Sequence, residues 1–204
     1  MKQGLPAWEG ISGDAEAQLE TFVTFLQSWN GRINLVGRAD TATLWQRHVL
    51  DSAQLVPVLP PGSDPFIDLG TGAGFPGLVL AALTRRHAHL VESDQRKAAF
   101  LREAIGLLGV DATVHATRAE SLRLPAARLI TARALAPLPR LLSLAAPLLA
   151  PDGVCLFPKG ANAVAELTAA RQDWQMQVEH FESRTDPTGA ILRLCEIRRA
   201  PPNR

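Results

Sequence analysis

The sequence has few cysteines and almost no net charge. Only Cys155 and Cys195 occur among its 204 residues, and both lie in apolar, strand-like runs. We therefore expect buried thiols, with no disulfide framework and no metal site. The 21 Lys and Arg residues nearly balance the 20 Asp and Glu residues, for a formal net charge of +1. Affinity for a nucleic acid would then require a local basic patch.

Long apolar runs are also missing. The longest candidate, residues 135–150, is interrupted by Pro137, Pro139, Arg140 and Pro147, so a transmembrane helix of roughly 18 apolar residues is not predicted. The first ten residues lack the apolar centre of a signal peptide. These absences predict a cytoplasmic protein without membrane contact, and its length predicts one domain with room for a small appendage. We expect a monomer.

A glycine-rich segment, Asp68–Gly77, is the most informative part of the chain. It follows the apolar pair Phe66-Ile67 and precedes an apolar series at residues 78–83. Its glycines at positions 70, 72 and 74 permit positive φ angles and leave room for a ligand, and the start of a helix offers unpaired N–H groups. The segment predicts a strand, a turn and a helix that together hold a nucleotide-like cofactor.

Two classes of cofactor fit this segment. Gly72, Gly74 and Gly77 match the dinucleotide fingerprint G-x-G-x-x-G, with Glu92 placed 20 residues after Gly72, which indicates an NAD-dependent oxidoreductase. Read from Asp68, the segment D-x-G-x-G-x-G resembles motif I of S-adenosylmethionine-dependent methyltransferases. Asp68 favours the methyltransferase, because a carboxylate at this point would repel a pyrophosphate and would suit a cationic aminoacyl group. Asp68 either contacts that group or binds backbone amides of the turn.

Composition divides the chain into two parts. Helical spacing of apolar residues predicts helices at residues 14–29 and 41–55, and a proline-rich stretch at residues 57–62 follows them. We therefore assign residues 1–60 to an N-terminal helical cap and residues 61–204 to one compact cofactor-binding domain.

Strands and helices alternate in the second part. The expected strands are residues 65–69, 87–92, 113–115, 129–132 and 154–157, and the expected helices are residues 77–85, 94–108, 137–149 and 162–173. Such alternation predicts right-handed βαβ units and a doubly wound parallel sheet. Residues 175–182 and 190–197 instead predict an antiparallel hairpin. The predicted fold is the α/β fold of class I methyltransferases, a mostly parallel seven-stranded sheet ending in a hairpin. A dinucleotide domain would need a second nucleotide-binding half in place of the hairpin.

Further segments make the resemblance more specific. In chain order, these segments are Asn34-Leu35, His48-Val-Leu-Asp51-Ser52, Phe75-Pro76-Gly77, Val91-Glu92-Ser93, Arg96-Lys97, Phe100-Leu101, Arg118-Ala119-Glu120, Thr131-Ala-Arg133-Ala134 and Lys159-Gly160. This ordered set resembles the bacterial 16S ribosomal RNA guanine-N7 methyltransferase family, also called glucose-inhibited division protein B, over roughly residues 20 to 197.

The resemblance implies a site for S-adenosylmethionine, which leaves as S-adenosylhomocysteine. Glu92 should accept hydrogen bonds from the ribose hydroxyls, Ala119 and Glu120 should lie beside the adenine, and Arg133 should face the methionine end, where a guanidinium can bind a carboxylate bidentately. The implied cofactor-binding set is Asp68, Gly70, Gly72, Gly74, Phe75, Glu92, Ala119, Glu120 and Arg133. Thr131 stands where the family often has serine, and Arg96 where many relatives have lysine.

The resemblance also implies the substrate, a guanine in the 530 loop of 16S rRNA (guanine 527 in standard rRNA numbering), presented as RNA or as a small-subunit particle. Guanine N7 is an unprotonated lone pair, so methyl transfer can proceed mainly by positioning, and we name no general base. His48, Asp51 and Arg133 are candidate positioning residues. Basic residues near strand ends are candidate RNA contacts: Arg85, Arg86, Arg96, Lys97, Arg118, Arg123 and Lys159. A noncatalytic RNA-binding assembly factor of the same fold is an alternative function.

Overall fold

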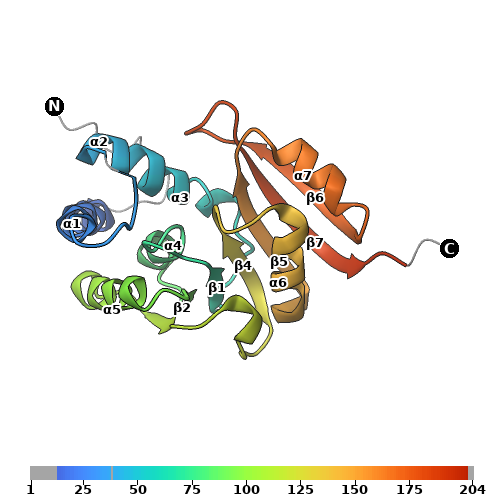
Figure 1. Ribbon diagram of the computed structural model, residues 1–204, viewed down its shortest axis with the longest axis horizontal. Helices are drawn as coiled ribbons and strands as arrows, with labels where there is room; N and C mark the ends of the chain where they lie inside the picture. The colour runs from blue at the N-terminus through green and yellow to red at the C-terminus, as the bar shows by residue number, and fades with distance from the viewer. Residues whose placement is uncertain (1–12, 38, 202–204) are drawn as a thin grey trace.

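The protein is described here by a computed structural model, which defines residues 13–37 and 39–201. Within these ranges, one seven-stranded sheet with the strand order β3-β2-β1-β4-β5-β7-β6 forms the centre of the molecule (Figure 1). Residues 1–12 of the expected cap lie outside the described part of the chain.

The strands follow the predicted alternation. Their bounds are β1 Phe66–Leu69, β2 Ala88–Val91, β3 Ala112–His115, β4 Ala127–Ala132, β5 Leu149–Lys159, β6 Trp174–Glu182 and β7 Ala190–Arg199. The first five strands pair in parallel. β7 pairs antiparallel with both β5 and β6. The predicted fold class, a mostly parallel sheet closed by an antiparallel hairpin, is confirmed.

Helices cover both faces of the sheet, so two apolar cores form. α1 (Gly13–Asn30), α4 (Gly77–Thr84) and α5 (Gln95–Leu108) pack on one face, around the side chains of Phe22 and Phe100. α6 (Leu138–Ala145) and α7 (Ala163–Ala170) cover the β4–β5–β7 part of the other face (Figure 1). No described helix is both long enough and apolar enough to span a lipid bilayer.

The second helix of the cap differs from its prediction. Residues 41–55 were expected to form one regular helix, but the segment consists of α2 (Thr41–Leu44), a π-helical stretch (Trp45–Leu50) and α3 (Asp51–Ala53), followed by a 3₁₀ turn at Val56–Val58. A π-helical turn inserts an extra residue, and such turns recur at functional sites. His48 lies within the π-helical stretch.

Other boundaries also differ from their predictions, with the largest differences at α6 and β5. The helix expected at residues 137–149 ends at Ala145 and continues as a 3₁₀ turn, Ala146–Leu148, because Pro147 cannot donate a helical hydrogen bond. β5 therefore begins at Leu149, earlier than residue 154. Between β3 and β4 there is only a 3₁₀ turn, Ala119–Ser121.

Candidate functional site: a cavity at the carboxyl ends of the strands

The glycine-rich turn joins β1 to α4 at the centre of the sheet. Gly72 has a φ of +58°, a left-handed conformation that side chains with a Cβ rarely adopt. This conformation directs the Gly72 N–H to Glu92, whose Oε2 accepts its hydrogen bond at 3.0 Å. The turn is thereby attached to the end of the neighbouring strand β2, a contact that was not predicted.

Asp68, in β1, is hydrogen-bonded to the end of the turn. Its carboxylate is fully buried and accepts hydrogen bonds from the Gly77 N–H, at 3.0 Å, and from the Thr131 hydroxyl, at 2.7 Å. Gly77 is required here, because a Cβ at this position would lie 2.7 Å from Asp68 Oδ2. Of the two roles left open for Asp68, the structure therefore shows the binding of a turn amide.

A cavity of about 750 Å³ opens beside this turn, a size typical of small-molecule sites. Most of the predicted cofactor-binding residues line it: Gly70, Gly72, Phe75, Glu92, Ala119, Glu120 and Arg133. Asp68 and Gly74 are not part of the lining. Lys97 and Arg118, predicted as RNA contacts, are part of it instead.

Glu92 is the buried acidic group of the cavity, whose lining also includes Glu120. Its side chain is largely buried, with Oε2 bonded to Gly72 N–H and Oε1 bonded to the Asp94 N–H at 2.8 Å. Two backbone amides thus fix its orientation, and each carboxylate oxygen keeps a second lone pair. Those lone pairs can accept hydrogen bonds from a ligand hydroxyl.

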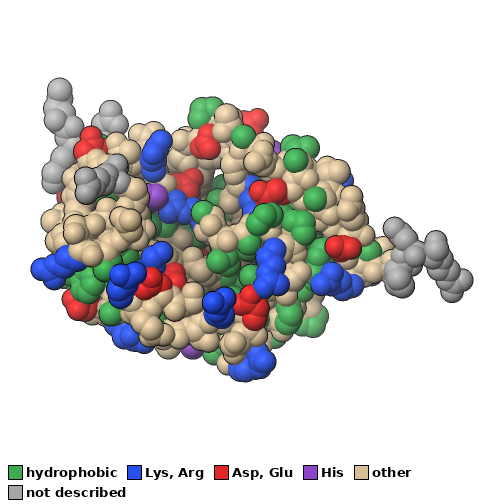
Figure 2. Space-filling model, in the orientation of Figure 1, with side chains coloured by type: hydrophobic (Ala, Val, Ile, Leu, Met, Phe, Trp, Pro, Cys, Tyr) green, Lys and Arg blue, Asp and Glu red, His purple; other side chains and the backbone are tan. Residues whose placement is uncertain are grey.

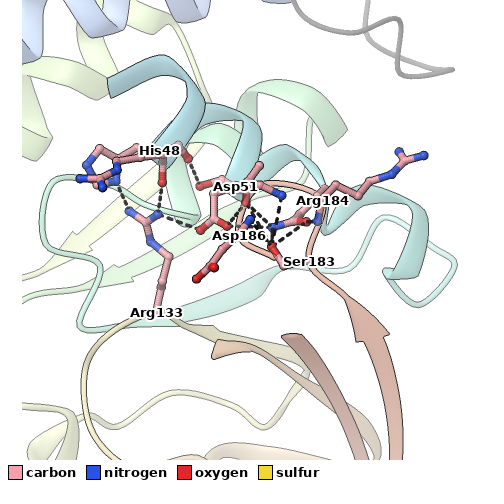
Figure 3. A network of polar contacts seen from close by, with 10 residues as sticks. His48, Asp51, Arg133, Ser183, Arg184 and Asp186 are labelled. Atoms are coloured by element: carbon pink, nitrogen blue, oxygen red, sulfur yellow. Dashed lines mark hydrogen bonds and ion pairs between the residues drawn. The ribbon is translucent and has the colours of Figure 1, made fainter. Parts of the chain in front are cut away.

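Arg133 connects the end of β4 to the π-helical stretch and to α3. Its Nη1 donates to Asp51 Oδ2 and to the Arg47 carbonyl, both at 2.9 Å, and its Nη2 donates to His48 Nδ1 at 2.8 Å (Figure 3). The guanidinium also lies 5.2 Å from the ring centroid of Phe75. These contacts use three of the five N–H donors of an arginine, which leaves two for a ligand.

The three candidate positioning residues, His48, Asp51 and Arg133, are therefore in contact. These contacts determine the protonation state of His48. Because a guanidinium only donates, His48 Nδ1 must accept, and the proton of the neutral ring lies on Nε2. Burial, with Arg133 nearby, lowers the pKa of His48 to about 4. The ring stacks on Phe75 with centroids 5.0 Å apart. His48 is therefore uncharged at neutral pH.

Sequence reasoning missed the other half of this contact set. Asp51 Oδ1 accepts hydrogen bonds from Thr185 Oγ1, at 2.6 Å, and from Gln54 Nε2, at 2.8 Å. Gln54 Oε1 also accepts from the Arg184 N–H in the hairpin loop, at 2.8 Å. We call Asp51, Arg133, Gln54 and Thr185 the Asp51 network. No motif marked Gln54 or Thr185; the only signal was the hairpin turn at residues 186–189.

The predicted basic residues lie in different parts of the molecule, and four of the seven lie at the end of the sheet that carries the cavity. Arg85 and Arg86 precede β2, at the edge of the sheet opposite the cavity, and Arg86 is buried with its Nη2 donating to the Pro60 carbonyl at 2.7 Å. Lys159 is also enclosed and forms an ion pair with Glu166 at 2.8 Å. The remaining candidates, Arg96, Lys97, Arg118 and Arg123, follow the carboxyl ends of β2 and β3. Figure 2 shows the molecule hollowed near its centre, with Lys and Arg side chains beside the opening.

A buried group, Asp68, and a half-buried one, His48, should give opposite pH dependences of stability. Burial raises the pKa of Asp68 to about 6, whereas an unfolded aspartate titrates near ~3.9. Between these values the folded state binds more protons, so this contribution falls as pH rises. His48, with its pKa lowered to about 4, binds its proton more readily in the unfolded state, so its contribution rises with pH.

Substitution should separate these two effects. Relative to wild type, Asp68→Asn should become more stable as pH rises from about 4 to 6, by on the order of 2 to 3 kcal/mol, and His48→Asn should become less stable over the same range. Urea unfolding at several pH values measures both differences. Parallel curves for wild type and both variants would contradict the assigned pKa shifts.

Comparison with known proteins agrees with this geometry. The profile of the GidB family, described as rRNA small subunit methyltransferase G, matches residues 15–188. Proteins named ribosomal RNA small subunit methyltransferase G are 55% identical in Rhodospirillum centenum, over 92% of this chain and 87% of that protein, and 53% identical in Acidiphilium cryptum, over 93% and 89%.

Solved structures show the same fold at much lower identity. An S-adenosylmethionine-dependent methyltransferase from Aquifex aeolicus aligns with a TM-score of 0.59 at 13% identity, covering 74% of this chain and 92% of its own. A ribosomal protein L11 methylase from Lactobacillus delbrueckii aligns with a TM-score of 0.55 at 17% identity, covering 80% and 81%. The family match and the close relatives set aside the alternative of an NAD-dependent oxidoreductase. The chain belongs to the GidB family of small-subunit rRNA methyltransferases and is an S-adenosylmethionine-dependent methyltransferase.

Proposed function

We propose that the protein transfers a methyl group from S-adenosylmethionine to N7 of a guanine in the 530 loop of 16S rRNA. The observation that carries the proposal is the cavity between the glycine turn and the end of β4, with the oriented carboxylate of Glu92 on one side and the two remaining donors of Arg133 on the other. An rRNA substrate implies action in the cytoplasm. The expected monomer would be checked by sedimentation velocity.

The residues of the cavity suit S-adenosylmethionine. Glu92 would accept hydrogen bonds from the ribose hydroxyls, Ala119 and Glu120 would border the adenine, and the donors of Arg133 would bind the methionine carboxylate. The cavity volume of about 750 Å³ is sufficient for a ligand of this size. When bound, the cofactor supplies an activated methyl group on its sulfonium.

Guanine N7 requires no general base, and the contacts of His48 and Asp51 leave neither residue free to act as one. An unprotonated lone pair attacks without losing a proton, so orientation of the reactants, worth roughly 7–11 kcal/mol, can provide much of the acceleration. His48 cannot act at Nδ1, which is occupied by Arg133. Asp51 is held in an ion pair with Arg133. Both residues would position the cofactor end of the site through Arg133.

Methyl transfer with a labelled cofactor tests the proposal. The protein is incubated with tritiated S-adenosylmethionine and either deproteinised 16S rRNA or small-subunit particles that lack the modification. We expect label in 16S rRNA, and chemical cleavage at 7-methylguanosine should locate it in the 530 loop. Label elsewhere in the RNA, or in protein or small molecules only, would overturn the proposal. Calorimetry should show binding of S-adenosylhomocysteine and none of NAD.

A further inference from the structure

A second cavity, of about 460 Å³, adjoins the cofactor cavity. It lies between the end of β4, the end of β5 and the loop between β6 and β7, and both cavities are lined by residues 133–136. A molecule in the second cavity would therefore contact the same short segment as the cofactor, from the other side. No predicted cofactor contact other than Arg133 lines it.

The shared segment has features of a built site. Ala134 adopts a φ of +53°, a conformation that costs about 1 kcal/mol or more for a residue other than glycine and that clusters at functional sites. Leu135 follows it and exposes 38% of its surface. A Cβ on Gly70 would lie 2.5 Å from Leu135 Cδ1, so Leu135 lies directly over the glycine turn. Leu135 therefore presents an apolar surface at the junction of the two cavities.

Most polar groups of the second cavity are already engaged. Lys159 donates to the Ala136 carbonyl at 2.8 Å and pairs with Glu166, and Asp51 belongs to the Asp51 network. Asp186 is different: its Oδ1 accepts from the Thr188 N–H and hydroxyl, while its Oδ2 has no hydrogen-bond partner among the described residues. The bonds from Thr188 lower the pKa of Asp186, so a charged oxygen is available to a ligand.

The loop that carries Asp186 is fixed in place. Gln54 accepts from the Arg184 N–H at 2.8 Å, Thr185 donates to Asp51 at 2.6 Å, and Ser183 Oγ accepts from the Asp186 N–H at 3.2 Å (Figure 3). The cap and the end of β4 therefore determine where Asp186 lies relative to the cofactor cavity. A recognition group for a planar base requires such fixed placement.

On the basis of the proposed function, we propose that this second cavity receives the target guanine, with the base against Leu135 and with the two lone pairs of Asp186 Oδ2 accepting its N1–H and N2–H. Enzymes that modify a base within RNA or DNA often extrude it and read its Watson–Crick edge. Guanine presents two adjacent donors there, which match the two lone pairs of the free Asp186 oxygen. N7 lies on the opposite side of the base, so the reacting atom faces the cofactor cavity. Adenine, with an acceptor at N1, would be rejected.

A cycle that combines a protein variant with a base analogue tests this contact. Asp186→Asn retains the acceptor for Thr188 and replaces the free oxygen with a donor. Inosine at the target position lacks the N2 amino group. Glu182→Gln is the matched control, because Glu182 is an exposed acid at the end of β6 that does not line the cavity. The substrate is 16S rRNA ligated to carry guanine or inosine at that one position, in whichever form the wild type methylates.

We expect Asp186→Asn to lower kcat/KM on guanine by about ten- to a hundredfold, the loss of a hydrogen bond to a charged group, with binding of S-adenosylhomocysteine unchanged. Inosine should lower kcat/KM about tenfold for the wild type and for Glu182→Gln, and less than threefold for Asp186→Asn. If the losses caused by Asp186→Asn and by inosine multiplied in the combination, or if Asp186→Asn left kcat/KM unchanged, the guanine contact would be overturned while the proposed function stands. A wild type that methylates no 16S rRNA would instead refute the proposed function.

Discussion

Replacing Arg133 with alanine is expected to destabilise the protein by about 3 kcal/mol and to abolish methylation. The Arg133 and Asp51 side chains are only 16% and 17% exposed, and removing one partner leaves the other as an uncompensated charge. The same substitution removes the donors to His48 and to the Arg47 carbonyl. Urea unfolding measures the loss of stability, and transfer of a tritiated methyl group measures the loss of activity.

Two controls distinguish the role of Arg133 from general damage. Arg133→Lys retains the charge but has no planar set of donors for three partners, so it should recover part of the stability and little of the activity. In a double-mutant cycle, Arg133→Ala with Asp51→Ala should destabilise less than the sum of the single changes, by 1 kcal/mol or more. Additive losses would mean that the two residues act independently. An Arg133→Ala protein that binds RNA but does not methylate it would also argue against a noncatalytic assembly factor.

Replacing Gly77 with alanine is expected to have the second largest effect. The added Cβ would lie 2.4 Å from Leu90 Cδ2, 2.7 Å from Asp68 Oδ2 and 3.0 Å from Asp68 Cβ. These side chains are buried in the sheet, so α4 must move away and the hydrogen bond from Gly77 N–H to Asp68 must lengthen or break. We expect a loss of about 3 kcal/mol, from overpacking and a weakened hydrogen bond, together with weaker binding of S-adenosylhomocysteine.

Gly106 offers a matched control with the opposite sign. It lies in α5, where nothing comes within 4 Å of an added Cβ. Gly106→Ala should therefore stabilise the protein by about 0.5 to 1 kcal/mol through helix propensity. If both alanine variants changed the unfolding free energy by the same amount, close approach at Gly77 would not be the reason for glycine there.

The elements of the fold could be predicted because their signals are local. The glycine turn after Phe66-Ile67 and the apolar stripe of α5 depend on residues near in sequence, and both lie where they were expected. The π-helical stretch at Trp45–Leu50 carries no such signal. The contacts of His48 and Asp51 with Arg133, more than 80 residues away, were not predicted, and no local pattern marks them.

In the candidate site, too, some features could be predicted from local sequence signals and others could not. The positions of Gly72 and Glu92 at strand ends followed from the predicted parallel sheet, since parallel strands present their carboxyl ends at one edge. Asp186 and Gln54 could not be identified in this way. Their roles depend on a loop folding back onto the cap, which only tertiary contacts between distant segments determine.

The contacts of Asp51 have a consequence for synthesis on the ribosome. This side chain bonds Arg133 and Thr185, which lie 82 and 134 residues later in the chain. A nascent chain that has released its cap and glycine turn still lacks both partners, and the hairpin loop is made only after β6. Domains generally fold as units as they are made, so we expect the catalytic geometry to form only after this loop has been made. A prematurely terminated chain would then carry the glycine turn but no competent site.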